Sequence, residues 1–344
     1  MRKYILLFLF VSCYTVGYSQ IVRGIILDSK TKTPISFASV YFSSTLSGTI
    51  SDDKGYFELD RSKHPSMSIT VSSIGYYSFT LTDFSTTQPI QIFLKSKEYE
   101  IKETVIKSKS LVKDRMRYMK KFKEEFLGKT ENARKCRILN DSDITFDYYA
   151  NKDTLRAFAL KPILIENDAL GYIVTSYLDK FEYSRKSKKV CYMGNIVFKE
   201  YPANKKKQMA YAKNRKNAYL GSRMHFFRSL SENDSIVDGF KVANSNFESL
   251  LLKDIAAGNK ILNLYNDYLH FKDIVVQDSL GNRYLSYRSE LKIIYPAGRT
   301  YISFLKKYVF FDKTGYFDSS GIEWSGAMGY QQIADWLPYE YTIK

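Results

Sequence analysis

Histidine is scarce in this chain of 344 residues, which has only three. A zinc peptidase needs ligands that converge on one metal ion, typically His-x-x-Glu with a distant second histidine and a carboxylate base. The histidines His64, His225 and His270 are followed at the third position by Met67, Arg228 and Asp273. Neither His-x-x-Glu nor His-Glu-x-x-His therefore occurs, and the sequence argues against a zinc peptidase.

Other catalytic and binding motifs are missing as well. No Gly-x-Ser-x-Gly pentapeptide and no glycine-rich phosphate loop is present. Asp52 and Asp53 lack the twelve-residue EF-hand spacing, and a hairpin turn ending at Gly55 explains them. Lys188 and Lys189 could activate Cys191, but a strand cysteine beside a solvated turn is the simpler interpretation. We predict no catalytic residue, no metal and no cofactor.

Long apolar runs are absent except at the N-terminus, so no membrane-spanning helix is predicted beyond it. Residues 1–19 have the form of a secretory signal, with basic residues at 2 and 3, a short apolar stretch, and a small-x-small site at Gly17-Tyr18-Ser19. We predict cleavage between Ser19 and Gln20, and an exported protein that is periplasmic, associated with the outer membrane, or secreted. A lipoprotein anchored through Cys13 is the alternative.

Cysteine is also rare, and removal of the signal leaves only Cys136 and Cys191. Export permits a disulfide between them, because oxidising compartments let such bonds persist. Two buried thiols that behave as small hydrophobic side chains are the alternative. The sequence leaves both open.

Aromatic residues, by contrast, are abundant, with 29 Tyr and 23 Phe, and they favour strands. From Gly24 to Tyr76, short runs with apolar residues at alternate positions are separated by Gly, Asp and Pro turns. The alternating positions are Ile26, Ile35, Phe37, Val40, Phe42, Phe57, Leu59, Ile69 and Val71. This pattern predicts a small antiparallel β-sandwich over residues 20–107. Tyr77–Leu81 and Ile90–Leu94 are two further strands, and Tyr99–Ile106 is the expected last edge strand.

The ordered residues of this segment resemble a known family. They include Gly24-x-Ile26-x-Asp28, Pro34-Ile35-x-x-Ala38-x-Val40, Asp53-x-x-Gly55-x-Phe57-x-Leu59 and Ser72-x-x-Gly75-Tyr76. The pattern is similar to the carboxypeptidase-regulatory-like domain, a transthyretin-like β-sandwich common in exported proteins of the Bacteroidetes. The resemblance implies a sandwich of seven or eight strands without catalytic residues of its own. That domain also occurs at the N-terminus of TonB-dependent transporters, for which this chain is too short.

The rest of the chain predicts a connecting helix and a β-rich α+β domain, so that the protein is mainly β with some α. Residues 108–130 form the helix, with Val112, Met116, Met119, Phe122 and Phe126 on one face, and it is expected to pack on the sandwich. Residues 131–344 form the domain, with strands to residue 202, one helix over 205–233, a shorter helix near 247–257 and a β-rich end. Stretches such as 126–130 and 218–230 resemble a conserved block in longer Bacteroidetes proteins, which implies no activity.

Positive charge dominates. Without the signal, 50 Lys and Arg stand against 36 acids, a net charge of +14. One cluster holds a single acid, Glu200, among its basic residues, which are Arg185, Lys186, Lys188, Lys189, Lys199, Lys205, Lys206, Lys207, Lys213, Arg215 and Lys216. Residues 102–135 are also rich in Lys and Arg. This charge favours anionic partners. Export makes nucleic acid an unsuitable partner and favours anionic lipid, lipopolysaccharide or acidic polysaccharide, although a merely solubilising surface is an equal alternative.

Three functions follow. The first is a non-catalytic protein of the cell envelope that binds or scaffolds an anionic surface or another envelope protein. The second is an accessory protein of a TonB-dependent outer-membrane transport system, which rests on the fold alone. The third is an enzyme with its site after residue 130, built on His225 with Tyr219, Ser222 and Arg228, or on acids such as Asp168 and Glu323.

Overall fold

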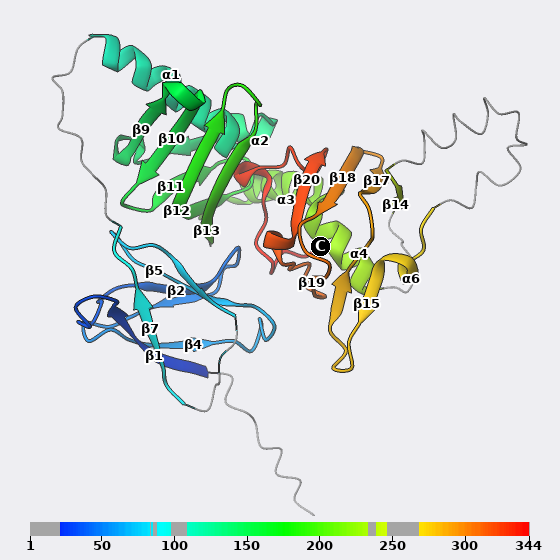
Figure 1. The fold of residues 1–344 in the computed structure, drawn as a ribbon, viewed down its shortest axis with the longest axis horizontal. Helices are drawn as coiled ribbons and strands as arrows, with labels where there is room; N and C mark the ends of the chain where they lie inside the picture. The colour runs from blue at the N-terminus through cyan, green and yellow to red at the C-terminus, as the bar shows by residue number, and fades with distance from the viewer. Residues whose placement is uncertain are drawn as a thin grey trace, which may run out of the picture.

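The computed structural model describes residues 21–82, 84, 88–97, 109–232, 239–245 and 268–343. The protein is mainly β, with several sheets and few helices, as the sequence predicts (Figure 1). The signal segment with Ser19 and Gln20, the expected edge strand at 99–106 and the expected helix at 247–257 lie outside the described residues.

The N-terminal part is a sandwich of two sheets. One sheet has the order β4-β1-β7, with β4 (Tyr56–Asp60), β1 (Ile21–Asp28) and β7 (Ile90–Leu94). The other has the order β3-β2-β5-β6, with β3 (Gly48–Ile50), β2 (Ser39–Phe42), β5 (Ile69–Ser72) and β6 (Phe79–Leu81). Alternate residues of both sheets fill one core.

Two details differ from the expected sandwich. The pairing of β1 with β7 is parallel, so the sheets are not wholly antiparallel. Phe37 was expected in the core but is 73% exposed, with φ of 55°. Phe37 lies in a left-handed turn before β2, so it does not follow the alternation of that strand. The turn directs the Phe37 ring outward.

A six-stranded sheet follows. Its strands are β8 (Cys136–Ile138), β9 (Ile144–Tyr149), β10 (Thr154–Ala159), β11 (Ile163–Asn167), β12 (Tyr172–Ser184) and β13 (Val190–Glu200), with the short helices η1 (Asp141–Asp143) and η2 (Ala150–Lys152) between them. The long β12 pairs with β11 and β10 along one edge and with β13 along the other. β13 is therefore an edge strand.

Helix α1 (Lys109–Phe126) covers this sheet, and the short α2 (Glu131–Arg134) follows it (Figure 1). Met119, Phe122 and Phe126 are buried in the core of the sheet, so α1 packs there and not on the sandwich. Met116, expected on the same face, is 63% exposed. The helix ends before Gly128, whose φ of 103° suits a residue without a side chain.

A third core is built by the C-terminal third of the chain. One sheet has the order β14-β17-β18-β20, with β14 (Lys241–Asn244), β17 (Leu291–Tyr295), β18 (Gly298–Phe304) and β20 (Ile322–Gly326). The other has the order β15-β16-β19, with β15 (Val275–Gln277), β16 (Arg283–Leu285) and β19 (Val309–Phe311). The short helices are α6 (Phe271–Ile274), η3 (Ser319–Gly321) and η4 (Ile333–Asp335). Residues 333–337 return to the core of the six-stranded sheet.

The helix expected over 205–233 is two helices, α3 (Lys205–Tyr219) and α4 (Arg223–Glu232). Gly221 separates them with φ of 76°, and a Cβ there would lie 2.6 Å from the ring of Tyr295. The apolar residues Met209, Phe226 and Leu230, which a single helix would place on one face, therefore lie on two helices with different axes. Phe226 and Leu230 of α4 are buried, whereas Met209 of α3 is 69% exposed.

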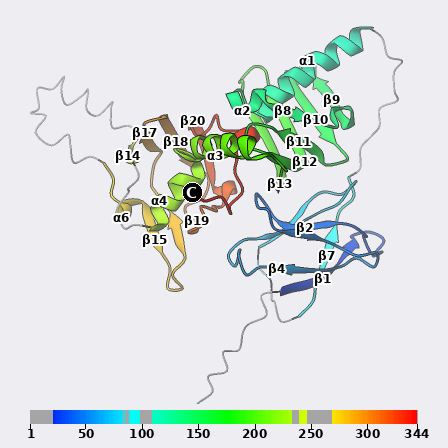
Figure 2. The same cartoon turned by 180° about the vertical axis from the view of Figure 1, so that it is seen from behind.

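The sandwich docks on the six-stranded sheet through the loop after β2 (residues 43–47), and the two lie against each other in both views (Figures 1 and 2). Ser44 N donates to Ile196 O at 2.8 Å, and Phe198 N donates to Thr45 O at 3.0 Å. The loop thus pairs with the open edge of β13. Backbone groups of an edge strand that would face water are satisfied in this way.

Candidate functional site: a basic edge and an interdomain clasp

The basic cluster of residues 185–216 does not form one patch. Arg185, Lys186, Lys188 and Lys189 lie in the turn between β12 and β13, and Lys199 lies near the far end of β13. At about 3.3 Å per residue, the eleven residues of β13 place the two groups roughly 35 Å apart. A contiguous surface over the whole cluster is therefore not formed.

The remaining basic residues of the cluster belong to α3, which is fixed against the turn after β11. Lys207 Nζ pairs with Asp168 at 2.9 Å, and Tyr211 Oη donates to the same carboxylate at 3.1 Å. Arg215 donates to Leu170 O at 2.7 Å and pairs with Glu200 at 3.1 Å. Lys207 and Arg215 therefore hold the helix in place.

The start of α3 lies beside the basic residues that follow α1. The hydrogen bond from Lys207 lowers the pKa of Asp168 against the effect of burial, and the nearby charge of Lys135 adds to this lowering. Asp168 N also donates to Lys135 O at 3.3 Å. Asp168 thus joins the basic segment after α1 to the lysines at the start of α3.

An open groove of about 990 Å³ continues this basic surface along α1. Its apolar part includes Met116 and Met119. Its polar part is mostly basic, with two acids, and includes Lys120, Lys123, Lys129, Arg134, Glu124 and Asp141. We define the basic edge as Lys120, Lys123, Lys129, Arg134, Lys135, Lys205, Lys206 and Lys207. Lys120, Lys135, Lys205 and Lys206 are exposed, and in the described part of the chain they form no ion pair. The outer face of α3 adds Lys213 and Lys216, which are also exposed.

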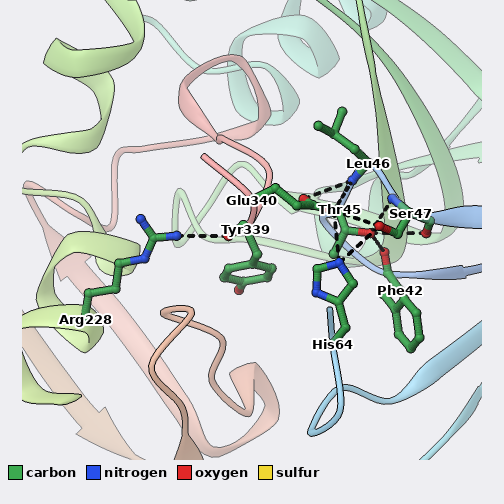
Figure 3. Close-up of polar contacts among 8 residues, drawn as sticks. All are labelled: Phe42, Thr45, Leu46, Ser47, His64, Arg228, Tyr339 and Glu340. Carbon is green, nitrogen blue, oxygen red and sulfur yellow. Dashed lines mark hydrogen bonds and ion pairs between the residues drawn. The ribbon is translucent and has the colours of Figure 1, made fainter. Parts of the chain in front are cut away.

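A second polar site joins the sandwich to the end of the chain (Figure 3). His64 is 3% exposed, and its Nε2 lies 3.0 Å from Glu340 Oε1 and 3.1 Å from Ser47 Oγ. Ser47 Oγ donates to the same carboxylate at 3.0 Å, and Leu46 N donates to it at 2.9 Å. These residues are called the clasp below.

Arg228 of α4 fixes the segment that carries Glu340 (Figure 3). Its guanidinium donates to three carbonyls: Thr314 O at 2.9 Å, Tyr341 O at 2.7 Å and Tyr339 O at 2.9 Å. Tyr339 N in turn donates to Ser44 O at 2.9 Å. The clasp therefore connects all three cores through residues 339–341.

Serine, histidine and a carboxylate also make up a hydrolase triad, but the geometry of the clasp is different. In a triad the serine contacts one ring nitrogen and the acid contacts the other. Here Ser47 and Glu340 share Nε2, and the buried Nδ1 has no partner among the described residues. The carboxylate is also held by Leu46 N. The arrangement suits a structural connection.

Acid is expected to weaken the clasp. Burial alone would raise the pKa of Glu340, but hydrogen bonds from His64 and Leu46 outweigh it and lower that pKa. A carboxylate with a lowered folded pKa stabilises the protein above its unfolded pKa, near 4.5, and this contribution is lost as the pH falls through the folded pKa. At pH 7, Glu340→Gln should cost about 2 kcal/mol of unfolding free energy in urea. The cost should shrink below about pH 4.5, and a cost independent of pH would contradict the assignment.

The two cysteines are free, so the disulfide that the sequence allowed is not formed. Cys136 of β8 is in register with Asn167, Tyr172 and then Glu200 across the sheet. Cys191 lies nine residues from Glu200 along β13, about 30 Å away. Burial raises the pKa of Cys136 to about 12, which keeps it a thiol, and Cys191 is exposed.

The residues of the enzymatic hypothesis have structural roles. His225 is 6% exposed among aromatic rings, and its Nδ1 accepts from Gly221 N at 3.1 Å. Ser222 Oγ accepts from His225 N at 3.1 Å and so caps α4. Asp168 anchors α3, and Glu323 lies on β20. Within the described residues, no group of three or more His, Cys, Asp or Glu could hold a metal ion.

Comparison with known families supports the first part of the molecule. Residues 22–106 match the family model described as the CarboxypepD_reg-like domain. This segment is a carboxypeptidase-regulatory-like domain. The sandwich and the resemblance seen in the sequence are thereby confirmed. The family is in general non-catalytic.

The carboxypeptidase-regulatory-like domain accounts for about a quarter of the chain. No curated protein sequence matches the chain. None of the described helices is long and apolar enough to cross a membrane. The basic edge and Glu340 of the clasp lie after residue 106, outside the matched segment.

Proposed function

We propose that this protein is a non-catalytic binding protein of the cell envelope, which uses its basic edge to contact an anionic membrane surface. The observation that carries the proposal is the set of exposed lysines Lys120, Lys135, Lys205 and Lys206, which form no ion pair with any described residue. Each lysine near an anionic surface adds about 1 kcal/mol of attraction. In this proposal the carboxypeptidase-regulatory-like domain stabilises and positions the sheet that carries the edge.

The groove beside α1 favours a lipid surface, and not a purely polar anion, as the partner. Met116 is 63% exposed at the groove, between cationic side chains. Apolar side chains flanked by lysine and arginine suit the boundary between headgroups and acyl chains. Lipopolysaccharide and acidic phospholipid offer this same combination of negative charge and acyl chain.

Vesicle binding tests the proposal. We expect the protein to sediment with vesicles of acidic phospholipid or lipopolysaccharide at low salt and to be released at about 0.5 M salt, because salt screens such attraction. Lys205→Gln/Lys206→Gln should weaken the partition coefficient roughly 30-fold, the equivalent of two lysines at about 1 kcal/mol each.

The turn between β12 and β13 offers a matched control. Lys186→Gln/Lys189→Gln removes the same charge at the opposite end of β13 from Glu200, roughly 35 Å from the end to which α3 is anchored. These variants should bind within about twofold of the wild type, apart from the small effect of net charge. Equal losses in both pairs of variants, or binding that salt does not weaken, would overturn the proposal.

A further inference from the structure

A second hollow lies where the three cores meet, and none of the residues of the basic edge lines it. Its volume is about 470 Å³, within the range of pockets for small molecules. The loop after β2, the strands β5 and β6, the start of α4 and the segments 316–320 and 331–339 all contribute to its walls. The cavity therefore exists only when the sandwich is docked.

The walls are rich in hydroxyl groups. Ser43, Ser44, Thr82 and Ser319 line the cavity, and their hydroxyls make no hydrogen bond with a described residue. The rings of Tyr316 and Trp336 lie in the same lining, and Met67, Met224 and Leu337 form its buried apolar part. Free hydroxyls beside aromatic rings suit a ligand that has both hydroxyl groups and apolar C–H faces.

One positive charge in the lining has no carboxylate partner among the residues that the structure describes. Arg223 donates through Nε and Nη2 to Met328 O, at 3.1 and 2.8 Å, and the described residues supply no ion pair to it. Burial lowers its pKa. A partly buried charge that has no counter-ion among the described residues would gain from pairing with an anionic group of a ligand.

The acids of the lining are already engaged. Asp318 pairs with Lys306 at 2.8 Å. Asp335 accepts hydrogen bonds from Thr130 at 2.8 Å and Asn132 at 2.9 Å, and burial raises its pKa. Arg223 is thus the charged group of the cavity that a ligand could pair with.

We propose that this cavity binds a small acidic saccharide of the uronic-acid class. Its carboxylate pairs with Arg223, its hydroxyls bond to the free serine and threonine hydroxyls, and its C–H faces lie against Tyr316 and Trp336. The site does not depend on the basic edge, so either proposal can fail without the other.

Calorimetric titration with D-glucuronate, glucose and lactate tests the site. We expect saturable binding of D-glucuronate at least 10-fold tighter than either control, because glucose lacks the carboxylate and lactate lacks the hydroxyl-bearing ring. No binding of D-glucuronate would overturn the proposal. If glucose bound with equal affinity, the proposed pairing of the carboxylate with Arg223 would be overturned. If lactate bound with equal affinity, the assignment of the ligand as a saccharide would be overturned.

Two variants locate the binding. Arg223→Met should weaken D-glucuronate roughly 10- to 100-fold, the range for a lost charged hydrogen bond. Because Arg223 also holds Met328 O, a second variant leaves the interior intact: Ser319→Phe at the exposed rim should close the cavity and abolish binding. Ser279→Phe, an exposed serine in the turn between β15 and β16, is the control. Wild-type affinity in Ser319→Phe would place the ligand elsewhere and overturn the site.

Discussion

Phe122→Ala is expected to lower the free energy of unfolding by about 3–5 kcal/mol, the usual cost of removing a buried phenylalanine ring. Phe122 is fully buried, and its ring centroid lies 4.7 Å from that of Phe126 and 4.8 Å from that of Phe181. The ring therefore fixes α1 to the six-stranded sheet. Urea unfolding followed by circular dichroism measures the change.

The same helix supplies the control. Met116 is 63% exposed, so Met116→Ala should change stability by less than about 0.5 kcal/mol. Similar losses in both variants would show that α1 does not present the described face to the sheet. Met116→Ala should also leave the salt dependence of vesicle binding unchanged, because it removes no charge.

Arg228→Met should be the second large effect, with a loss of about 3 kcal/mol. Three carbonyl groups lose a charged donor, and each unsatisfied buried group costs about 1–3 kcal/mol. Because Tyr339 and Tyr341 flank Glu340, the clasp should loosen as well. Limited proteolysis should then cut near the C-terminus faster than in the wild type.

A matched arginine distinguishes this effect from a general loss of charge. Arg185 is exposed in the turn after β12 and pairs with Asp153 at 3.8 Å, so Arg185→Met should cost less than about 1 kcal/mol. If Arg228→Met were as mild as Arg185→Met, the three carbonyls would not depend on Arg228. The connection of α4 to the end of the chain would then be wrong.

Local sequence determined much of the fold. Alternating apolar residues and Gly, Asp or Pro turns located the strands of the sandwich, because a half-buried strand needs a period of two. The same logic predicted strand character between residues 131 and 202, where the six-stranded sheet lies, but it did not resolve β11. It failed at Phe37, where a left-handed turn residue precedes the strand. It also merged α3 with α4. The break between them depends on the left-handed φ of a single residue, Gly221, and one glycine is a weak signal for the end of a helix.

The candidate sites depended more on tertiary structure. Sequence counting found the basic residues but joined Lys188 with Lys206, which the length of β13 separates. The mixture of Met116 and Met119 with lysines was a signal for the groove that residue counting alone passed over. Nothing in the sequence pointed to the clasp, because His64 and Glu340 are 276 positions apart and form no motif.

By itself, the sequence determined the carboxypeptidase-regulatory-like sandwich, the β-rich character of the chain and its positive charge, since these follow from local patterns and composition. The tertiary structure decided which charges share a surface, that Cys136 and Cys191 stay apart, and that Arg223 faces a hydroxyl-lined cavity between the cores. The physical reason is distance along the chain. Contacts between residues hundreds of positions apart form only when separate cores pack together, and no local pattern records them.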